Sequence, residues 1–183
     1  RNLTESPLYD YRQEHGYSPV VGEGDPDARV MFIGEAPGKE EARTGRPFVG
    51  AAGRILEALF ESVGLSRDEV YITNVVKDRP PENRDPRAAE IQLYAPFLLR
   101  QIQAIEPDVI VPLGRFATDF VLDRFANRDA DRRISQIHGQ PLEIEAGYGQ
   151  VAVIPMFHPA AAFYAQGRRE ALQEDFQTLE QYL

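Results

Sequence analysis

The chain has 183 residues, which suits one ordinary domain with a substantial core. It has no cysteine, so disulfides, thiolate nucleophiles and cysteine-ligated metal sites or clusters are excluded. No stretch approaches the roughly 18 apolar residues of a membrane-spanning helix, and no signal peptide is evident. We therefore expect a single domain over residues 1–183, compatible with the cytoplasm and without a membrane partner.

The formal net charge of −9 argues mildly against a nucleic-acid partner, because contact with phosphates favours a basic surface. The distribution of charge matters more than the sum. Basic residues concentrate in two stretches, residues 43–54 and 77–87. This pattern predicts an acidic protein with one basic face, which would bind a nucleic acid weakly and in a salt-dependent way.

The first half of the chain contains two strand patterns around one helix pattern. Residues 1–20 form a polar, aromatic arm in which we expect little regular structure. Residues 29–33 are a short apolar run typical of a buried strand. Residues 51–63 carry a helical apolar stripe, and Gly64 follows as a helix stop. Residues 70–73 are β-branched or aromatic, which predicts a second strand.

The second half continues the alternation. Asp85 and Pro86 predict the start of a helix that runs to Ile105, with a break near Pro96, which lacks the amide of an interior position. Further strands are predicted at residues 109–113 and 151–156, and helices at 115–125 and 168–183. This order predicts an α/β fold, a three-layer α/β/α sandwich with a central, mainly parallel four-stranded sheet.

Polar segments follow three of the four predicted strands. The segment Gly34-Glu35-Ala36-Pro37-Gly38 follows the first strand, Asn74 closes the second and His158 follows the fourth. In open parallel sheets, ligands bind beyond the carboxyl ends of the strands. We therefore expect these three segments to converge on one edge of the sheet and to form a site.

Together and in this order, these segments resemble the motif set of the uracil-DNA glycosylase superfamily. The resemblance is to its family 4 branch, and it extends from about Val20 to the C-terminus. It implies an enzyme that hydrolyses the N-glycosidic bond of uracil in DNA, in base excision repair, after the nucleotide has left the base stack. The implied partner is DNA that contains uracil, and we expect a monomer.

The resemblance implies a substrate pocket lined by Gly34, Ala36, Gly38, Glu41, Phe48 and Asn74. Phe48 would stack on the flipped-out base, and Glu41 would face C5 of uracil and help to exclude the methyl group of thymine. The Asn74 amide can match O4 and N3–H of uracil at once, and cytosine reverses that pattern. From the residues alone, a core phenylalanine, a surface acid and a loop-capping asparagine stay open as ordinary alternatives.

The implied catalytic residues are Glu35, Asn74 and His158. His158 would donate to uracil O2 as negative charge develops on the leaving base. Glu35 would either position the attacking water or stabilise the cationic sugar, and the sequence leaves these two roles open. His15 and His138 are interpreted as structural residues.

For contact with DNA we expect Lys77, Arg79, Arg84, Pro159 and Phe163. The three basic residues lie in a proline-rich loop beside Asn74, where a solvated loop is the ordinary alternative. The residue that fills the vacated base stack should follow His158, and the sequence leaves Phe163 and Tyr164 open.

One departure from the family is large. Family 4 enzymes hold an iron–sulfur cluster with four cysteines, and the resemblance places two of these positions at Asp78 and near Tyr94. The other two belong to the arm before Val20. We therefore expect no cofactor and no metal. In place of the cluster we expect aromatic packing between Tyr94 and tyrosines of the arm.

Two other functions stay open at this stage. The chain could excise another deaminated base such as hypoxanthine, or it could be a catalytically inactive DNA-binding relative. A flavodoxin-like nucleotide binder fits the sheet, but the chain lacks a phosphate-loop lysine motif.

Overall fold

The computed structural model describes residues 3–126 and 133–183. Its sheet has the strand order β1-β3-β2-β4-β6-β5. The six strands are β1 (Glu23–Gly24), β2 (Val30–Gly34), β3 (Tyr71–Asn74), β4 (Val109–Pro112), β5 (Leu142–Glu145) and β6 (Gln150–Val153). The central strands β3, β2, β4 and β6 are parallel, and β1 and β5 pair antiparallel at the two edges.

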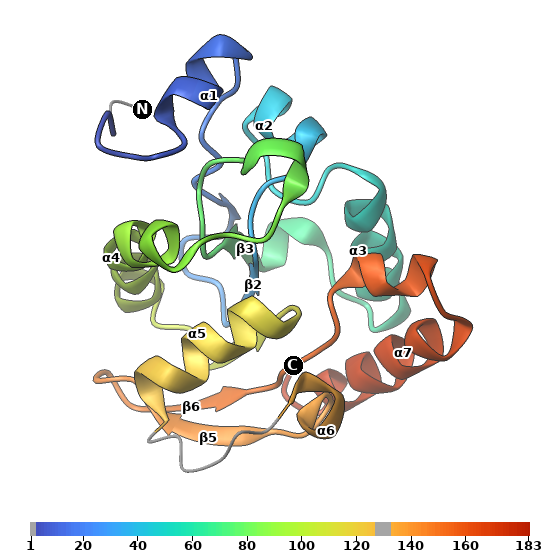
Figure 1. Cartoon of the computed structure of the whole chain (residues 1–183). Coiled ribbons are helices and arrows are strands. Elements are labelled where there is room, and N and C mark those ends of the chain that lie inside the picture. Colours follow the sequence, from blue (N-terminus) through green and yellow to red (C-terminus); the bar gives the residue numbers. More distant parts are fainter. Residues whose placement is uncertain (1–2, 127–132) are drawn as a thin grey trace.

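Helices cover both faces of this sheet (Figure 1). The α-helices are α1 (Tyr9–Glu14), α2 (Lys39–Thr44), α3 (Ala51–Ser62), α4 (Ala88–Ile105), α5 (Arg115–Phe125), α6 (Ile134–Ile137) and α7 (Gln166–Glu180). Short 3₁₀ helices in the described residues are η1 (Arg67–Glu69), η2 (Pro81–Asn83) and η3 (Pro159–Phe163). Among the described helices, none combines the length and the apolar character needed to cross a membrane.

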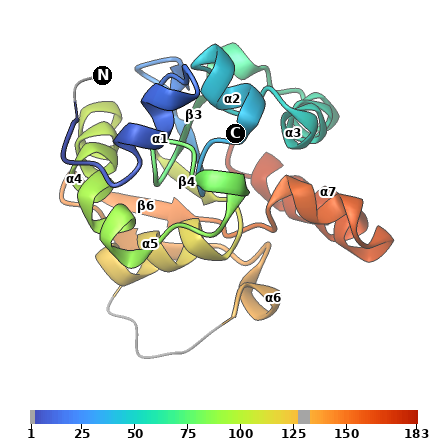
Figure 2. The ribbon, with the colours of Figure 1, turned by 45° about the horizontal axis from the view of Figure 1, so that its top comes forward.

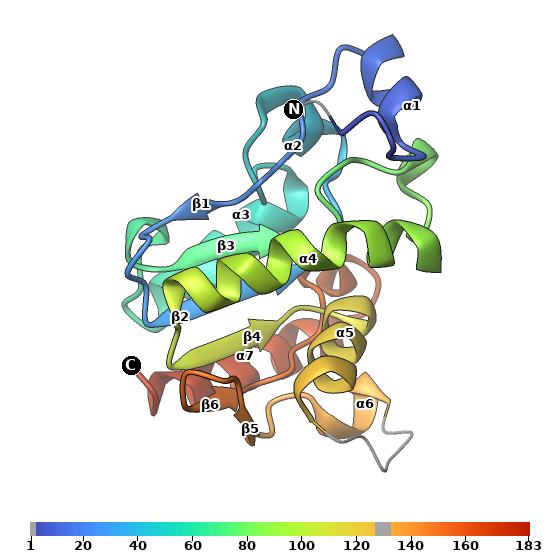
Figure 3. The same cartoon turned by 90° about the vertical axis from the view of Figure 1, so that its left-hand side faces the viewer.

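The alternation of side chains along β2 divides the core into two layers. Val30 and Phe32 pack with residues of α3 and α7. Met31 and Ile33 point to the other face and pack with residues of α4 and α5. Figure 3 shows α4 and α5 in front of the strands, with α3 and α7 behind. The expected three-layer α/β/α sandwich is confirmed.

The prediction of four strands was incomplete, because the sheet has six. The four predicted strands are the parallel ones. The two missed strands are edge strands, and they are formed by pairing with a neighbour rather than by an apolar run of their own. In β5, for example, Ile144 is the one buried residue.

Three predictions about helices were wrong. The arm is not without regular structure, since residues 9–14 form α1. Nor does a helix break at Pro96, because α4 runs without interruption from Ala88 to Ile105. Pro96 and Gln92 are both exposed, so water can reach the Gln92 carbonyl that Pro96 cannot serve. This helix also starts after Arg87, not at Asp85.

The carboxyl ends of the strands bring the polar segments together as expected. Gly34 and Asn74 lie opposite each other in the register of β2 and β3. A further parallel bridge joins Leu113 to Met156, two residues before His158. The loops after these strands therefore meet at one edge of the sheet.

Candidate active site

A cavity of about 510 Å³ lies at this edge and takes in all three polar segments. Such a volume lies in the usual range for small-molecule sites. Its lining includes the predicted residues Glu35, Ala36, Gly38, Glu41, Phe48, Asn74 and His158. The remaining predicted pocket residue, Gly34, is not part of the lining. It affects the cavity because it has no Cβ atom.

Gly34 allows Asn74 and Phe48 to approach each other closely. A Cβ atom at Gly34 would overlap Oδ1 of Asn74 and would lie 2.7 Å from the Phe48 ring. Asn74 is 2% exposed, yet within the described part of the chain its side-chain amide has no hydrogen-bond partner. Buried amides are normally bonded, so this amide is available to a ligand in the cavity.

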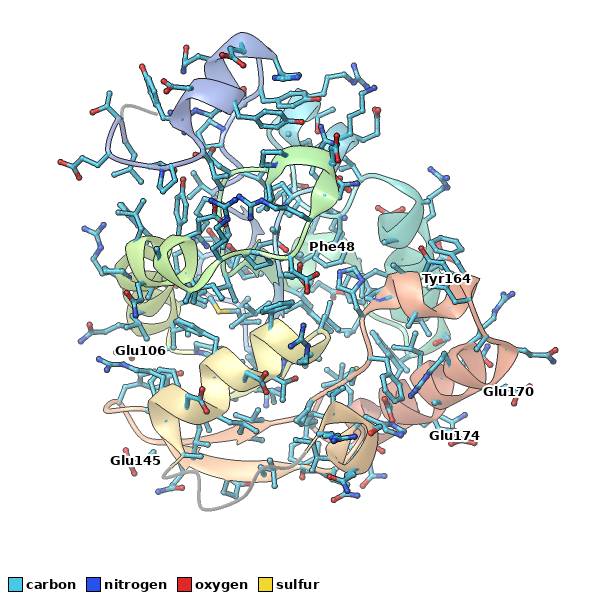
Figure 4. The ribbon with its side chains drawn as sticks, in the orientation of Figure 1. Phe48, Glu106, Glu145, Tyr164, Glu170 and Glu174 are labelled. Carbon is cyan, nitrogen blue, oxygen red and sulfur yellow. The ribbon has the colours of Figure 1, made fainter. Side chains whose placement is uncertain are left out.

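The backbone of Phe48 is held in an uncommon conformation. Its φ of 49° lies in the left-handed region, which a bulky residue rarely adopts. The Arg67 guanidinium donates a 3.0 Å hydrogen bond to the Phe48 carbonyl and a second bond to the carbonyl of Pro47. Gly53 lies so close to the Phe48 carbonyl that any side chain there would overlap it. These contacts fix the ring beside the pocket, where Figure 4 labels it.

His158 faces the same cavity with a neutral ring. Its ring centroid lies 5.6 Å from that of Phe48, and the two planes are inclined by 29°. Burial lowers the pKa of His158 to about 4, against a smaller opposing effect of Glu41. Nδ1 accepts a 3.2 Å hydrogen bond from the Ala160 amide. In the neutral ring the proton is then on Nε2, which makes this nitrogen a donor.

Glu35 has an unusual acidity. Burial, together with the nearby Asp85 carboxylate, raises its pKa to about 7, and the positive charge of Arg115 opposes this shift. A carboxyl group with this pKa changes its protonation state near neutral pH. Displaced pKa values in a cavity are typical of catalytic groups.

Glu41 lines the cavity and also shapes it. Its Oε1 accepts hydrogen bonds from the amides of Val49 and Gly50, at 3.0 and 2.8 Å. The carboxylate thereby holds the segment that carries Phe48. The expected contact of Glu41 with C5 of the base stays a prediction.

The structure contradicts a surface role for Lys77. Its side chain is buried, with 4% of the residue exposed. The ammonium donates to Thr73 Oγ1 at 2.7 Å, to the backbone carbonyl of Asn74 at 2.6 Å and to Gln101 Oε1 at 2.6 Å. Burial lowers the pKa of Lys77 to about 7. The residue supports β3 beneath Asn74, and it does not present a charge to a phosphate.

Arg79 and Arg84 are also engaged within the protein. Arg79 donates to the hydroxyl of Tyr17 at 2.8 Å and to Asn83 Oδ1 at 2.7 Å. Arg84 forms two hydrogen bonds with the Glu90 carboxylate, at 2.9 and 2.6 Å. Both arginines are half-buried. Their contact with DNA stays a prediction.

The segment after His158 contains both buried and exposed residues. Pro159 is buried, whereas Phe163 and Tyr164 are 55% and 87% exposed. Figure 4 shows Tyr164 on the outer side of η3. A neighbouring hollow of about 350 Å³ shares Ala51 and Phe163 with the cavity.

The sequence analysis did not name two arginines of that hollow as site residues, although Arg54 ends the basic stretch of residues 43–54. Arg54 and Arg169 are exposed, and no carboxylate belongs to the lining among the described residues. It also missed Arg67 and Gly114. A Cβ atom at Gly114 would lie 3.0 Å from Cβ of His158, and its φ of 86° favours glycine. A glycine directly after the third predicted strand was a usable signal, whereas nothing local marked Arg67.

These features define an α/β protein with a pocket for a planar, polar heterocycle. An aromatic ring, an unpartnered amide and a neutral imidazole surround the space where it would bind. The sequence profile of the family described as "Uracil DNA glycosylase superfamily" matches residues 21–183. The chain belongs to this superfamily.

Several curated proteins are similar to the chain over most of its length. A Type-4 uracil-DNA glycosylase of Archaeoglobus fulgidus is 45% identical over 87% of this chain and 79% of its own length. That of Sulfurisphaera tokodaii is 45% identical over 87% of this chain and 72% of its own. That of Saccharolobus solfataricus is 40% identical over 100% of this chain and 82% of its own.

Proposed function

We propose that the protein is a uracil-DNA glycosylase, a monofunctional hydrolase of base excision repair. Membership of the superfamily and the Type-4 uracil-DNA glycosylases among its relatives support this. The observation that carries the proposal is the Asn74 amide, which lies in the pocket beside Phe48 without a partner among the described residues.

Uracil is recognised by stacking and by two hydrogen bonds from one amide. The base lies against the Phe48 ring, an interaction worth about 1–3 kcal/mol. The Asn74 amide donates to O4 and accepts from N3–H. Cytosine carries a donor where uracil has O4 and an acceptor at N3, so both contacts fail and the polar groups of the site stay unpaired.

Hydrolysis breaks the C1′–N1 bond of the nucleotide. The bonding electrons move to the base, and the sugar acquires the character of an oxocarbenium ion. Nε2–H of His158 donates a hydrogen bond to uracil O2. It stabilises the anion without transferring its proton. Glu35 stabilises the cationic sugar or positions the water. The water oxygen bonds to C1′, and one of its protons ends on N1 of the released uracil.

The target nucleotide must leave the base stack before this reaction, at a cost of a few kcal/mol. We propose that the exposed ring of either Phe163 or Tyr164, both of which line the cavity, fills the gap. Arg79, Arg84 and Pro159 are proposed to contact the strand nearby. A single domain that acts as a monomer, and a cytoplasmic location, stay predictions.

The decisive experiment measures base release from oligonucleotides. Single-stranded and double-stranded substrates containing uracil are compared with substrates containing thymine, cytosine or hypoxanthine. Release of uracil alone is expected. Release of hypoxanthine instead would reassign the pocket to another deaminated base, and the absence of any release would indicate a DNA-binding relative without catalysis.

A further inference from the structure

A buried polar network joins the arm to the loop after β3 and to α4. Its members are Ser6, Arg12, Asp78 and Tyr94, here called the arm clasp, and each is at most 5% exposed. Arg12 bonds both oxygens of Asp78 at 3.0 and 2.7 Å. The Tyr94 hydroxyl donates to Asp78 at 2.5 Å. Ser6 Oγ lies 2.8 Å from that hydroxyl.

The hydrogen bonds of the arm clasp form one continuous series in which each group accepts from the preceding group and donates to the next. The amide of Leu8 donates to Ser6 Oγ, the Ser6 hydroxyl is left to donate to Tyr94, and Tyr94 donates to Asp78. Burial, together with the bond to Asp78, raises the pKa of the Tyr94 phenol far above its usual value, so the ring stays a donor. Among the described residues, Thr118 Oγ1 is the one side-chain polar atom that is completely inaccessible to water and lacks a partner, and it lies outside the clasp.

Tyr94 is therefore buried against the arm, but not through the contacts that the sequence predicted. Its ring lies beside Phe97 on its own helix, with a centroid distance of 6.3 Å. The tyrosines Tyr11 and Tyr17 pair with each other, at 6.1 Å. The link from the arm to Tyr94 is the Ser6 hydroxyl. The prediction that Tyr94 packs against tyrosine rings of the arm was wrong, because its contact with the arm is a hydrogen bond.

The arm clasp does not fit an iron–sulfur cluster. Such a cluster needs four thiolates or close substitutes, and the chain has no cysteine. Asp78 and Tyr94 stand where the family resemblance places two cluster ligands. The Asp78 carboxylate is bonded on both oxygens, and a guanidinium such as that of Arg12 is a permanent cation and cannot bind a metal. Among the described residues, no three histidine, aspartate or glutamate side chains gather in a way that could hold a metal ion.

The arm clasp holds one end of a segment that lines the pocket. Pro80, Asn83 and Arg84 all line the cavity, and residues 79–84 are here called the wall segment. Asp78 directly precedes it. Figure 2 shows α1 of the arm close to the chain that leads into α4.

Further contacts tie the arm to the wall segment and to the residues just before it. The Val20 amide donates to the carbonyl of Lys77, which precedes Asp78, at 2.7 Å. Arg79 joins the hydroxyl of Tyr17 to Asn83, whose φ of 54° is a left-handed conformation that needs support. The other end of the wall segment is fixed by Arg84 on Glu90.

We propose that the arm clasp positions the wall segment of the pocket without a metal, so that Arg12, Asp78 and Tyr94 are positioning residues for catalysis. The kinetic part of this inference rests on the proposed function. A loosened clasp leaves the wall segment in its binding-competent position for a smaller fraction of the time. The apparent affinity for substrate then falls by that fraction, and the chemical step in the bound complex stays the same.

Tyr94→Phe tests the proposal with the smallest change, since it removes one hydroxyl and keeps the ring. We expect KM for a uracil oligonucleotide to rise about 3- to 10-fold, as loss of one hydrogen bond allows, with kcat within about twofold of the parent. The matched control is Tyr148→Phe, whose hydroxyl donates to the Pro107 carbonyl at 3.1 Å, away from the pocket lining. This control should keep the parent KM.

Hydrogen exchange and limited proteolysis give a readout that does not depend on activity. In Tyr94→Phe, the arm and the wall segment should exchange and be cleaved several-fold faster than in the parent, and in Tyr148→Phe they should not. If Tyr94→Phe does not fold, Ser6→Ala removes one weaker link and gives the same pattern. Should the parent release no uracil, the proposed function fails and these measurements still decide on the arm clasp.

The iron content of the protein tests the statement that the arm clasp works without a metal. Protein produced with added iron and purified without oxygen should contain far less than one iron per chain. Stoichiometric iron would overturn the proposal. Equal KM and equal exchange in Tyr94→Phe and the parent would overturn it as well.

Discussion

The candidate active-site pocket and the arm clasp use polar side chains in opposite ways, although Asn74 and Asp78 lie in one short segment. In the pocket, the Asn74 amide has no partner among the described residues, and Glu35 and His158 have displaced pKa values. In the arm clasp, the groups around Asp78 bond to one another. Polar groups without a partner can bond to a substrate, whereas polar groups that are bonded to one another hold the backbone in place.

The comparison predicts the largest loss of activity in the pocket. Asn74→Asp should lower kcat/KM for uracil release by about 100-fold or more, equivalent to about 3 kcal/mol. A carboxylate cannot donate to O4 and repels the uracil anion. Single-turnover kinetics on a uracil oligonucleotide measure the effect, with thermal unfolding as the control for folding. A variant that works at the parent rate would show that another group reads the base.

The arm clasp should show its largest effect in stability. Arg12→Met leaves the buried Asp78 carboxylate without its cation, so the free energy of unfolding should fall by about 3–5 kcal/mol. The control is Arg29→Met, which breaks an exposed ion pair with Asp108 and should cost less than about 1 kcal/mol. Urea unfolding measures both. Equal losses in the two variants would remove the distinction between the clasp and an ordinary surface pair.

Lys77 lies between the two regions and should make stability depend on pH. Its pKa is lowered from 10.5 to about 7, so between these values the unfolded chain binds one proton more than the folded protein. Stability should therefore rise with pH from 7 to 9, by about 1 kcal/mol per unit. Lys77→Met should lose this slope. A parent whose unfolding free energy is flat from pH 7 to 9 would contradict the buried, weakly basic ammonium.

The smallest effect is expected for the exposed arginines of the neighbouring hollow. The double variant Arg54→Ala and Arg169→Ala should weaken binding of uracil-containing and normal DNA alike, by a few-fold at low salt. The slope of log K against log salt concentration should fall by about one for each phosphate contact that is lost. Fluorescence anisotropy at several salt concentrations measures this. Arg29→Met, at the opposite edge of the sheet, is the control. If the control loses as much affinity, the DNA-binding face lies elsewhere.

The sequence by itself determined the α/β class, the four parallel strands and the place of the pocket. These features depend on local patterns. Apolar runs specify buried strands, and polar residues directly after parallel strands must meet at one edge of the sheet. Gly34, Asn74 and His158 could therefore be selected before any coordinates, because their positions at the strand ends follow from the chain order.

The tertiary structure alone decided the partners of the charged residues. Arg12 and Asp78 are 66 residues apart in sequence, and Ser6 and Tyr94 are 88 apart. Likewise, the burial of Lys77 depends on Gln101 of α4. A lysine or an aspartate in a loop normally faces water, and it is buried only where a distant segment supplies a complementary group. Such pairing is a property of the packed fold, and no local pattern in the chain encodes it.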